Sequence, residues 1–103
     1  GAFFFIYVVS ELVKNFYVQG KIPKDYLFYY RDKDQKEIDL LYVDRGMIYP
    51  MEIKKGLAPK KATKNFNVLD KYHLNIGNGL VIDCCDKIRP ISENQYYIPV
   101  HLL

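Results

Sequence analysis

Two carboxylates and a lysine in this sequence are the residue types of a metal-dependent hydrolytic site. Asp39 precedes Glu52 by thirteen residues, and Lys54 follows Glu52 by two. Clustered carboxylates raise each other's pKa unless a cation lies between them, and Mg²⁺ prefers such oxygen ligands. The ion would polarise a phosphodiester and activate a water, while Lys54 positions that water or offsets negative charge. The pattern indicates phosphodiester hydrolysis with Mg²⁺ or Mn²⁺.

Two predicted strands carry these residues, over residues 37–43 and 47–54. The turn between them is short, which favours antiparallel pairing and brings Asp39 close to Glu52. Side chains alternate along a strand, so Glu52 and Lys54 share one face. A surface salt bridge between Glu52 and Lys54 beside a solvated Asp39 explains the same residues and remains an alternative.

A run of lysines without acidic neighbours follows the Glu-Ile-Lys strand. Between residues 53 and 69 the acidic residues are absent and the basic ones are Lys54, Lys55, Lys60, Lys61 and Lys64. Lysines on a solvated helix usually alternate with Glu four positions away, so their isolation here favours phosphate binding. We expect the last four to hold a DNA backbone, with a solvated helix face as the alternative.

The rest of the chain is organised around these residues. Apolar periodicity and turn residues predict a helix over 3–18, strands over 26–30, 80–85 and 96–102, and a second helix that starts near Pro59 and buries Ala62, Phe66, Leu69 and His73. The first helix is apolar nearly all round at its start, so we expect it to be well covered. It also presents Glu11, which we expect to add a direct or indirect metal ligand. The element order predicts an α/β sandwich with a mixed sheet.

Composition excludes several classes of protein. The chain has 103 residues, 50% of them hydrophobic, and a net charge of +3 from 15 basic and 12 acidic groups. This balance excludes a disordered tail, and the adjacent Cys84 and Cys85 are badly placed to bond each other, which suits the reducing cytoplasm. The apolar run at the start is too short to cross a membrane, and no Gly-rich loop that would bind ATP is present.

Four segments of the sequence carry a resemblance to a known family: the start Gly1-Ala2 with residues 8–12, and residues 30–40, 50–55 and 98–100. They resemble the C-terminal domain of unknown function of a large prokaryotic group of AAA-type P-loop ATPases. That domain is similar to the PD-(D/E)XK nuclease superfamily. The resemblance implies a restriction-endonuclease-like sandwich with core order αβββαβ, here followed by a C-terminal strand.

The resemblance also implies roles for individual residues. Asp39 and Glu52 would bind the metal, Lys54 would be the catalytic lysine and Glu11 the acid of the first helix. Two positions depart from the pattern: Ile38 replaces the Pro of the superfamily's name, and Phe5 stands where the family usually carries Glu.

These features lead to one leading hypothesis and two alternatives. We expect residues 1–103 to form a single nuclease-like domain that processes DNA. It would be the C-terminal part of a longer ATPase, and the N-terminal ATPase domain of the same chain would be its partner. One alternative is a nucleic-acid-binding module without catalysis. The other is a protein-interaction or self-association domain, which ten tyrosines and an apolar N-terminal segment favour.

Overall fold

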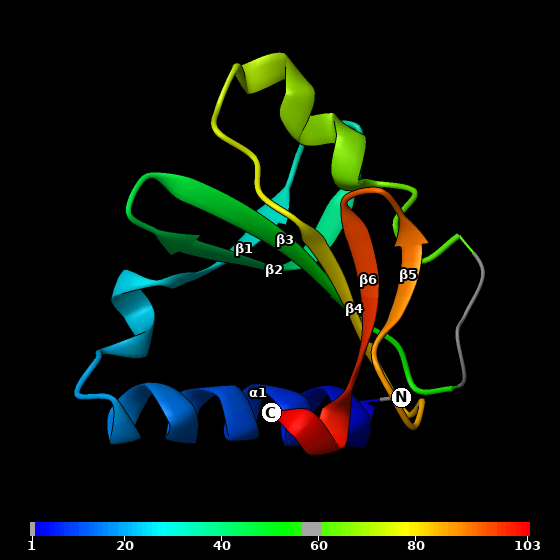
Figure 1. Ribbon diagram of the computed structural model, residues 1–103. Coiled ribbons are helices and arrows are strands. Elements are labelled where there is room, and N and C mark those ends of the chain that lie inside the picture. Colours follow the sequence, from blue (N-terminus) through cyan, green and yellow to red (C-terminus); the bar gives the residue numbers. More distant parts are fainter. Residues whose placement is uncertain (1, 57–60) are drawn as a thin grey trace.

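An N-terminal helix and six strands follow one another in a computed structural model that describes residues 2–56 and 61–103 (Figure 1). Three short 3₁₀ helices, named η1 to η3, connect or end these elements. In chain order the elements are α1 (Ala2–Val18), η1 (Pro23–Asp25), β1 (Leu27–Arg31), β2 (Glu37–Asp44), β3 (Met47–Ile53), η2 (Phe66–Tyr72), β4 (Gly79–Asp83), β5 (Arg89–Ser92), β6 (Gln95–Pro99) and η3 (Val100–Leu102).

The strands form one mixed sheet in the order β1-β2-β3-β4-β6-β5. The first three strands pair antiparallel, as their short turns predict. Parallel pairing joins β3 to β4 and β4 to β6, and β5 closes the far edge antiparallel to β6. Figure 1 shows α1 along one face of the sheet and η2 on the other. The predicted α/β sandwich with a mixed sheet is confirmed.

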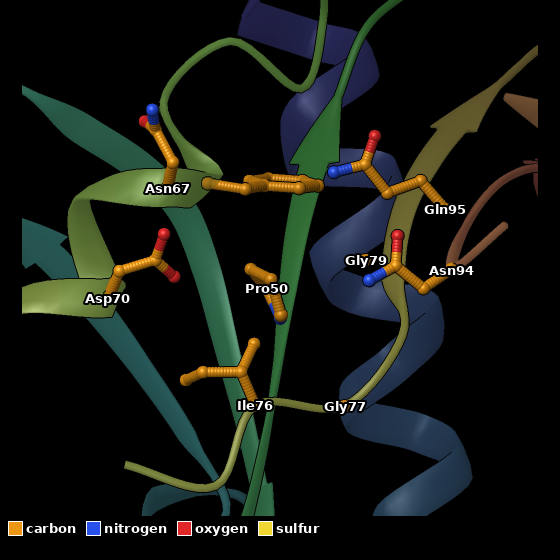
Figure 2. Close-up of a pocket in the computed structure, with 9 residues that line it drawn as sticks. Pro50, Asn67, Asp70, Ile76, Gly77, Gly79, Asn94 and Gln95 are labelled. Carbon is orange, nitrogen blue, oxygen red and sulfur yellow. The ribbon is translucent and has the colours of Figure 1, made fainter. Parts of the chain in front are cut away.

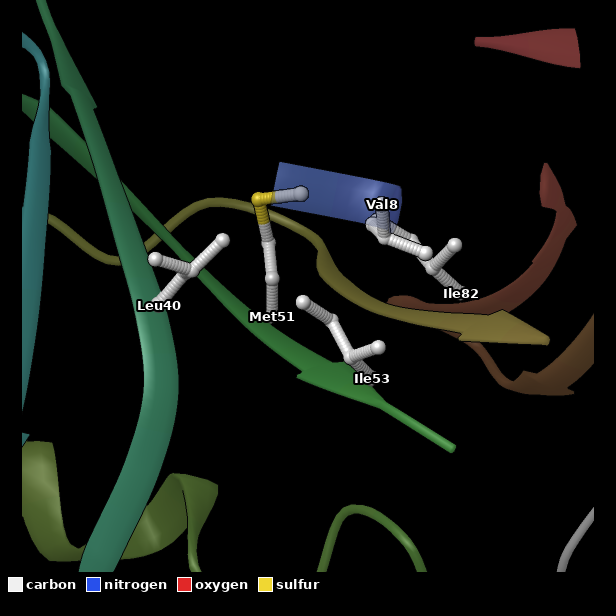
Figure 3. Packing of buried hydrophobic residues seen from close by; sticks show 5 residues of the cluster. All are labelled: Val8, Leu40, Met51, Ile53 and Ile82. Atoms are coloured by element: carbon white, nitrogen blue, oxygen red, sulfur yellow. The ribbon is translucent and has the colours of Figure 1, made fainter. Parts of the chain in front are cut away.

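Each face of the sheet has its own apolar cluster. The α1 face is packed with Val8, Leu40, Met51, Ile53 and Ile82 (Figure 3). The η2 face is packed with Ile38, Phe66 and Leu69. Burial of apolar side chains on both faces holds the strands between the helices. Polar residues of β2 and β3 are therefore partly enclosed as well.

The second helix differs from the prediction. The expected start at Pro59 lies outside the described residues, and the helix that follows is a 3₁₀ helix that begins at Phe66. Lys61 has a left-handed φ of 60°, so no continuous right-handed helix runs from residue 61 onward. Of the predicted buried stripe, Phe66 and Leu69 are buried, but His73 is exposed in a left-handed conformation that ends the helix.

Two further predictions near the C-terminus need correction. Strand β5 has no counterpart among the predicted strands; it contains Pro90 and lies at the sheet edge, where proline is tolerated. The last strand ends at Pro99 rather than at residue 102, and the chain turns into η3. Of the two free cysteines, Cys85 is buried as expected for a small apolar residue, but Cys84 is exposed.

Helix α1 is less covered than its composition predicts. Val8 and Phe16 are buried, whereas Phe3 is 90% exposed, Tyr17 65% and Val18 86%. The helix contacts the sheet on one side only, so its other apolar side chains face outward. Among the described residues, no helix combines the length and apolarity that crossing a membrane requires.

Candidate functional site

A β-bulge in β2 determines where Asp39 points. The β1–β2 register shifts between Phe28 and Tyr30, so that Asp39 and Leu40 lie opposite a single residue of β1. Ile38 therefore packs in the η2-side cluster while Leu40 packs in the α1-side cluster, although residues two apart on a regular strand share a face. Bulges of this kind re-aim side chains and are common beside active sites.

The side chain of Asp39 enters the pairing between β2 and β3. Regular pairing ends at Leu40 opposite Met51, which would place Asp39 opposite Glu52 at the next step. There the Oδ2 atom of Asp39 accepts a hydrogen bond from the backbone N–H of Ile53, at 2.8 Å. The Asp39 carboxylate is thus fixed at the end of β3, next to the position of Glu52. The spacing of the two residues in the sequence predicts this proximity.

Asp39 and Glu52 open into a small pocket on the η2 face of the sheet. Its volume is about 140 Å³, and its walls are formed by Glu37, Asp39, Glu52, Lys54, Lys61, Ala62, Lys64 and Asn65. The structure therefore brings together both predicted carboxylates, the predicted lysine and two of the predicted phosphate-binding lysines. Three carboxylates, Glu37 included, and three ammonium groups line this pocket, a set that can hold a cation and an anion together.

Burial and the neighbouring carboxylate control the protonation of Glu52. The residue is 6% exposed. Burial raises its pKa to about 8, aided by a hydrogen bond and charge repulsion from Asp39 and partly opposed by the charge of Lys54. Without a cation, Glu52 therefore holds a proton at neutral pH. A divalent ion between the two carboxylates would displace it.

The donor set is suited to Mg²⁺ rather than to a metal held entirely by the protein. Asp39 and Glu52 supply hard oxygen ligands, and Mg²⁺ is usually bound by one or two carboxylates together with waters and phosphate oxygens. Within residues 2–56 and 61–103, no group of three or more His, Cys, Asp or Glu side chains is arranged to hold a metal. A closed four-ligand zinc site therefore does not fit this part of the chain.

Two of the predicted site residues do not line the pocket. Glu11 forms an ion pair with Lys14, at 2.9 Å between Oε1 and Nζ, on the helix that covers the opposite face of the sheet. Lys55 is exposed and does not line the pocket. Lys60 lies outside the described residues.

Two residues of the pocket escaped the sequence reasoning. Glu37 begins β2, and Asn65 immediately precedes η2. The Nδ2 atom of Asn65 donates a hydrogen bond to the carbonyl of Glu37, at 3.0 Å. This bond ties the lysine-bearing segment to β2, a long-range contact for which the sequence offers no spacing signal.

A second set of contacts fixes η2 over the sheet. The hydroxyls of Tyr30 and Tyr72 lie 3.0 Å apart, and the Lys71 ammonium lies 3.4 Å from Oδ2 of Asp32. These contacts join η2 to the β1–β2 hairpin. They hold the segment that carries Lys61 and Lys64 near the two carboxylates.

The whole chain, residues 1–103, matches the family model described as "Domain of unknown function (DUF4143)". The protein therefore belongs to this family, whose description states no activity. No curated protein and no solved structure matches the chain significantly.

Proposed function

We propose that this domain is a metal-dependent nuclease of the PD-(D/E)XK type that hydrolyses phosphodiester bonds of DNA. The observation that carries the proposal is the shared pocket of Asp39, Glu52 and Lys54, bordered by Lys61 and Lys64. Each of these residues has a separate task in such a reaction. Segments 30–40 and 50–55 resemble the C-terminal domain of AAA-type ATPases, and the similarity of that domain to the superfamily supports the same assignment.

Asp39 and Glu52 would hold Mg²⁺ or Mn²⁺ in this pocket. When bound, the ion polarises the phosphodiester and lowers the pKa of its water. Lys54 stands two residues from Glu52 and orients the attacking water or stabilises negative charge on the phosphate oxygens. Lys61 and Lys64 bind the flanking phosphates without regard to base sequence.

The proposed cellular setting is a prokaryotic, cytoplasmic ATPase of the AAA type. In that setting an N-terminal ATPase domain would deliver DNA to this domain or control its access. The resemblance of residues 8–12, 30–40, 50–55 and 98–100 to the C-terminal domain of such ATPases supports this proposal.

The test is a cleavage assay on single- and double-stranded DNA during titration with Mg²⁺ and Mn²⁺. We expect metal-dependent cleavage that Asp39→Asn and Lys54→Ala abolish or strongly reduce. Asp25→Asn and Lys33→Ala are matched controls, because both residues are exposed and neither lines the pocket. Cleavage by Asp39→Asn at the rate of Asp25→Asn would refute the assignment. Metal-independent DNA binding without cleavage would instead favour the non-catalytic binding module.

A second candidate function is protein interaction, and the exposed face of α1 favours it. Phe3, Tyr17 and Val18 place apolar surface in water along one helix, which is typical of contact with another protein. Sedimentation at several concentrations tests self-association through this face. Replacement of Phe3 and Val18 by Ser is expected to abolish a dimer if one forms.

A further inference from the structure

A second pocket lies on the same face of the sheet, beside the pocket of Asp39 and Glu52, which we call the carboxylate pocket. Its volume is about 190 Å³. Pro50, Phe66 and Ile76 line it with apolar atoms, and polar side chains line it as well, namely Asn67, Asp70, Asn94 and Gln95. Pro50 and Phe66 are buried, so Ile76 and the polar side chains offer most of the surface that a ligand could contact.

The polar side chains reach this pocket from two distant parts of the chain. Figure 2 shows Asp70, from η2, pointing across the pocket toward Asn94, from the β5–β6 turn, with Pro50 and Ile76 between them. Within the described part of the chain, no hydrogen bond or ion pair involves the side chains of Asp70 or Gln95. Their hydrogen-bonding capacity is therefore available to a ligand.

The charged groups of the two pockets differ. The described lining of the second pocket includes no Lys or Arg and carries the carboxylate of Asp70. The carboxylate pocket instead combines three acidic side chains with Lys54, Lys61 and Lys64. A phosphate would be repelled by Asp70 in the second pocket, whereas Lys54, Lys61 and Lys64 could pair with it in the other. A neutral ligand with N–H donors fits beside Asp70.

The two pockets are neighbours along two elements. Pro50 lines the second pocket and Glu52 lines the carboxylate pocket. The two residues are two positions apart on β3, which corresponds to about 6.6 Å along a strand. Likewise, Phe66 lines the second pocket and its neighbour Asn65 lines the carboxylate pocket. This separation is on the scale of a single nucleotide, from its phosphate to its base.

We propose that this second pocket binds one unpaired nucleobase of single-stranded DNA, and so selects single strands for the carboxylate pocket. The inference deepens the proposed nuclease function and rests on it for the position of the phosphate. Ile76, beside the buried Pro50 and Phe66, contacts the apolar ring, and Asp70 accepts a hydrogen bond from an exocyclic amino group, as carboxylates do from cytosine. Gln95 contributes an amide that both donates and accepts. In a duplex the same base edge is already paired, so duplex DNA cannot use the pocket.

The pocket also predicts a preference among bases. Cytosine offers an amino group where thymine offers a carbonyl oxygen, and the Asp70 carboxylate attracts the first and repels the second. Oligo(dC) should therefore bind more tightly than oligo(dT). An abasic strand of the same length keeps the phosphates but loses this contact.

The test is fluorescence anisotropy with labelled oligo(dC), oligo(dT), an abasic strand and a hairpin duplex, all in EDTA so that no metal-dependent cleavage occurs. Asp70→Ala and Gln95→Ala remove the base contacts. Glu93→Ala is the matched control for Asp70→Ala, because it also removes one exposed negative charge but lies outside the pocket. Comparing the two variants separates the base contact from the general gain in affinity when a negative charge is lost.

We expect oligo(dC) to bind at least about five-fold more tightly than oligo(dT) and the abasic strand, the size of one good base contact. Asp70→Ala should lose this preference and Glu93→Ala should keep it. Equal binding of oligo(dC) and the abasic strand, or an unchanged preference in Asp70→Ala, overturns the inference. The readout does not use cleavage, so an inactive nuclease with this preference would refute the proposed function alone.

Discussion

Asp39 replaces a backbone carbonyl in the hydrogen bonding between β2 and β3: its Oδ2 accepts the N–H of Ile53 at 2.8 Å. The same carboxylate lines the pocket with Glu52. One side chain thus closes the strand pairing and belongs to the proposed metal site. Substitutions of Asp39 must therefore separate its structural contribution from its role in the site.

Asparagine and alanine at position 39 should separate these roles. Asn keeps an oxygen that accepts the Ile53 N–H, so Asp39→Asn should remain close to wild type in stability while losing Mg²⁺ binding and cleavage. Asp39→Ala leaves that N–H without its acceptor and should cost about 1–3 kcal/mol of unfolding free energy. Urea denaturation measures the stability, and calorimetric titration measures the metal affinity. Equal destabilisation by both variants would contradict the hydrogen-bond role.

The stability of the metal-free protein should depend on Glu52. Burial and Asp39 raise the pKa of Glu52 from 4.5 to about 8. Between these values the folded state holds a proton that the unfolded state has released. Stability is therefore full below pH 4.5 and falls as pH rises toward 8, by at most about 1.4 kcal/mol per pH unit.

Glu52→Gln tests this dependence, because glutamine has no proton to lose. We expect the unfolding free energy of the wild type in EDTA to fall between about pH 5 and pH 8, and that of Glu52→Gln to fall less. Saturating Mg²⁺ should stabilise the wild type more at the higher pH and leave Glu52→Gln almost unchanged. Parallel pH profiles for both proteins in EDTA would show that Glu52 keeps an ordinary pKa.

The lysines that border the pocket should account for part of the salt dependence of DNA binding. Log K falls as log salt rises, and each phosphate contact that is lost makes this fall shallower. The change in slope is about 0.9 per contact for duplex DNA, or about 0.7 for a single strand. Replacing both Lys61 and Lys64 by Ala should therefore reduce the slope by roughly two such steps. The control is the double variant at Lys24 and Lys33, which removes two exposed lysines outside this pocket. Identical slopes for the two double variants would exclude a specific phosphate site.

Lys54→Ala should affect turnover more than affinity. Lys54 lies beside Glu52 in the pocket but is exposed, so its removal leaves the fold intact. Loss of one group that stabilises charge in a transition state costs about 100-fold or more in rate. Single-turnover cleavage at saturating protein measures that step apart from binding. A variant with a normal rate and weaker binding would make Lys54 a phosphate-binding residue.

Strand-level features were the most predictable part of this protein. The alternation around Glu52 and the short turns of the first three strands depend on local sequence, and these strands are observed with the predicted pairing. The bulge at Asp39 was not predicted, because it arises from a mismatch with β1 rather than from β2 itself. The predicted approach of Asp39 to Glu52 needed only the register of two neighbouring strands.

Features that depend on distant contacts escaped prediction. The second pocket, which we propose binds a nucleobase (the nucleobase pocket), combines Asp70 of η2 with Asn94 and Gln95, about 25 residues later. Nothing in the spacing of these residues connects them. The exposure of α1 likewise depends on what packs against it, since its apolar composition fits a covered helix equally well.

Close packing of η2 on β4 gives a last prediction. A Cβ on Gly79 would lie 2.6 Å from two ring atoms of Phe66, which is far inside van der Waals contact. Gly79→Ala must therefore displace the Phe66 ring, at a cost of about 1–3 kcal/mol in unfolding free energy. Combining it with Phe66→Leu should cost less than the sum of the two single changes, because the smaller side chain leaves room for the methyl group.

Gly20→Ala is the control for this packing effect. A Cβ there meets nothing within 4 Å, but the φ of 74° disfavours any side chain. Its cost comes from the backbone, so Phe66→Leu should not relieve it. Urea denaturation of the single and double variants measures each term. Additive losses in the Gly79→Ala and Phe66→Leu pair would mean that Phe66 does not pack against Gly79, and the apolar wall of the nucleobase pocket would then have to be assigned to other residues.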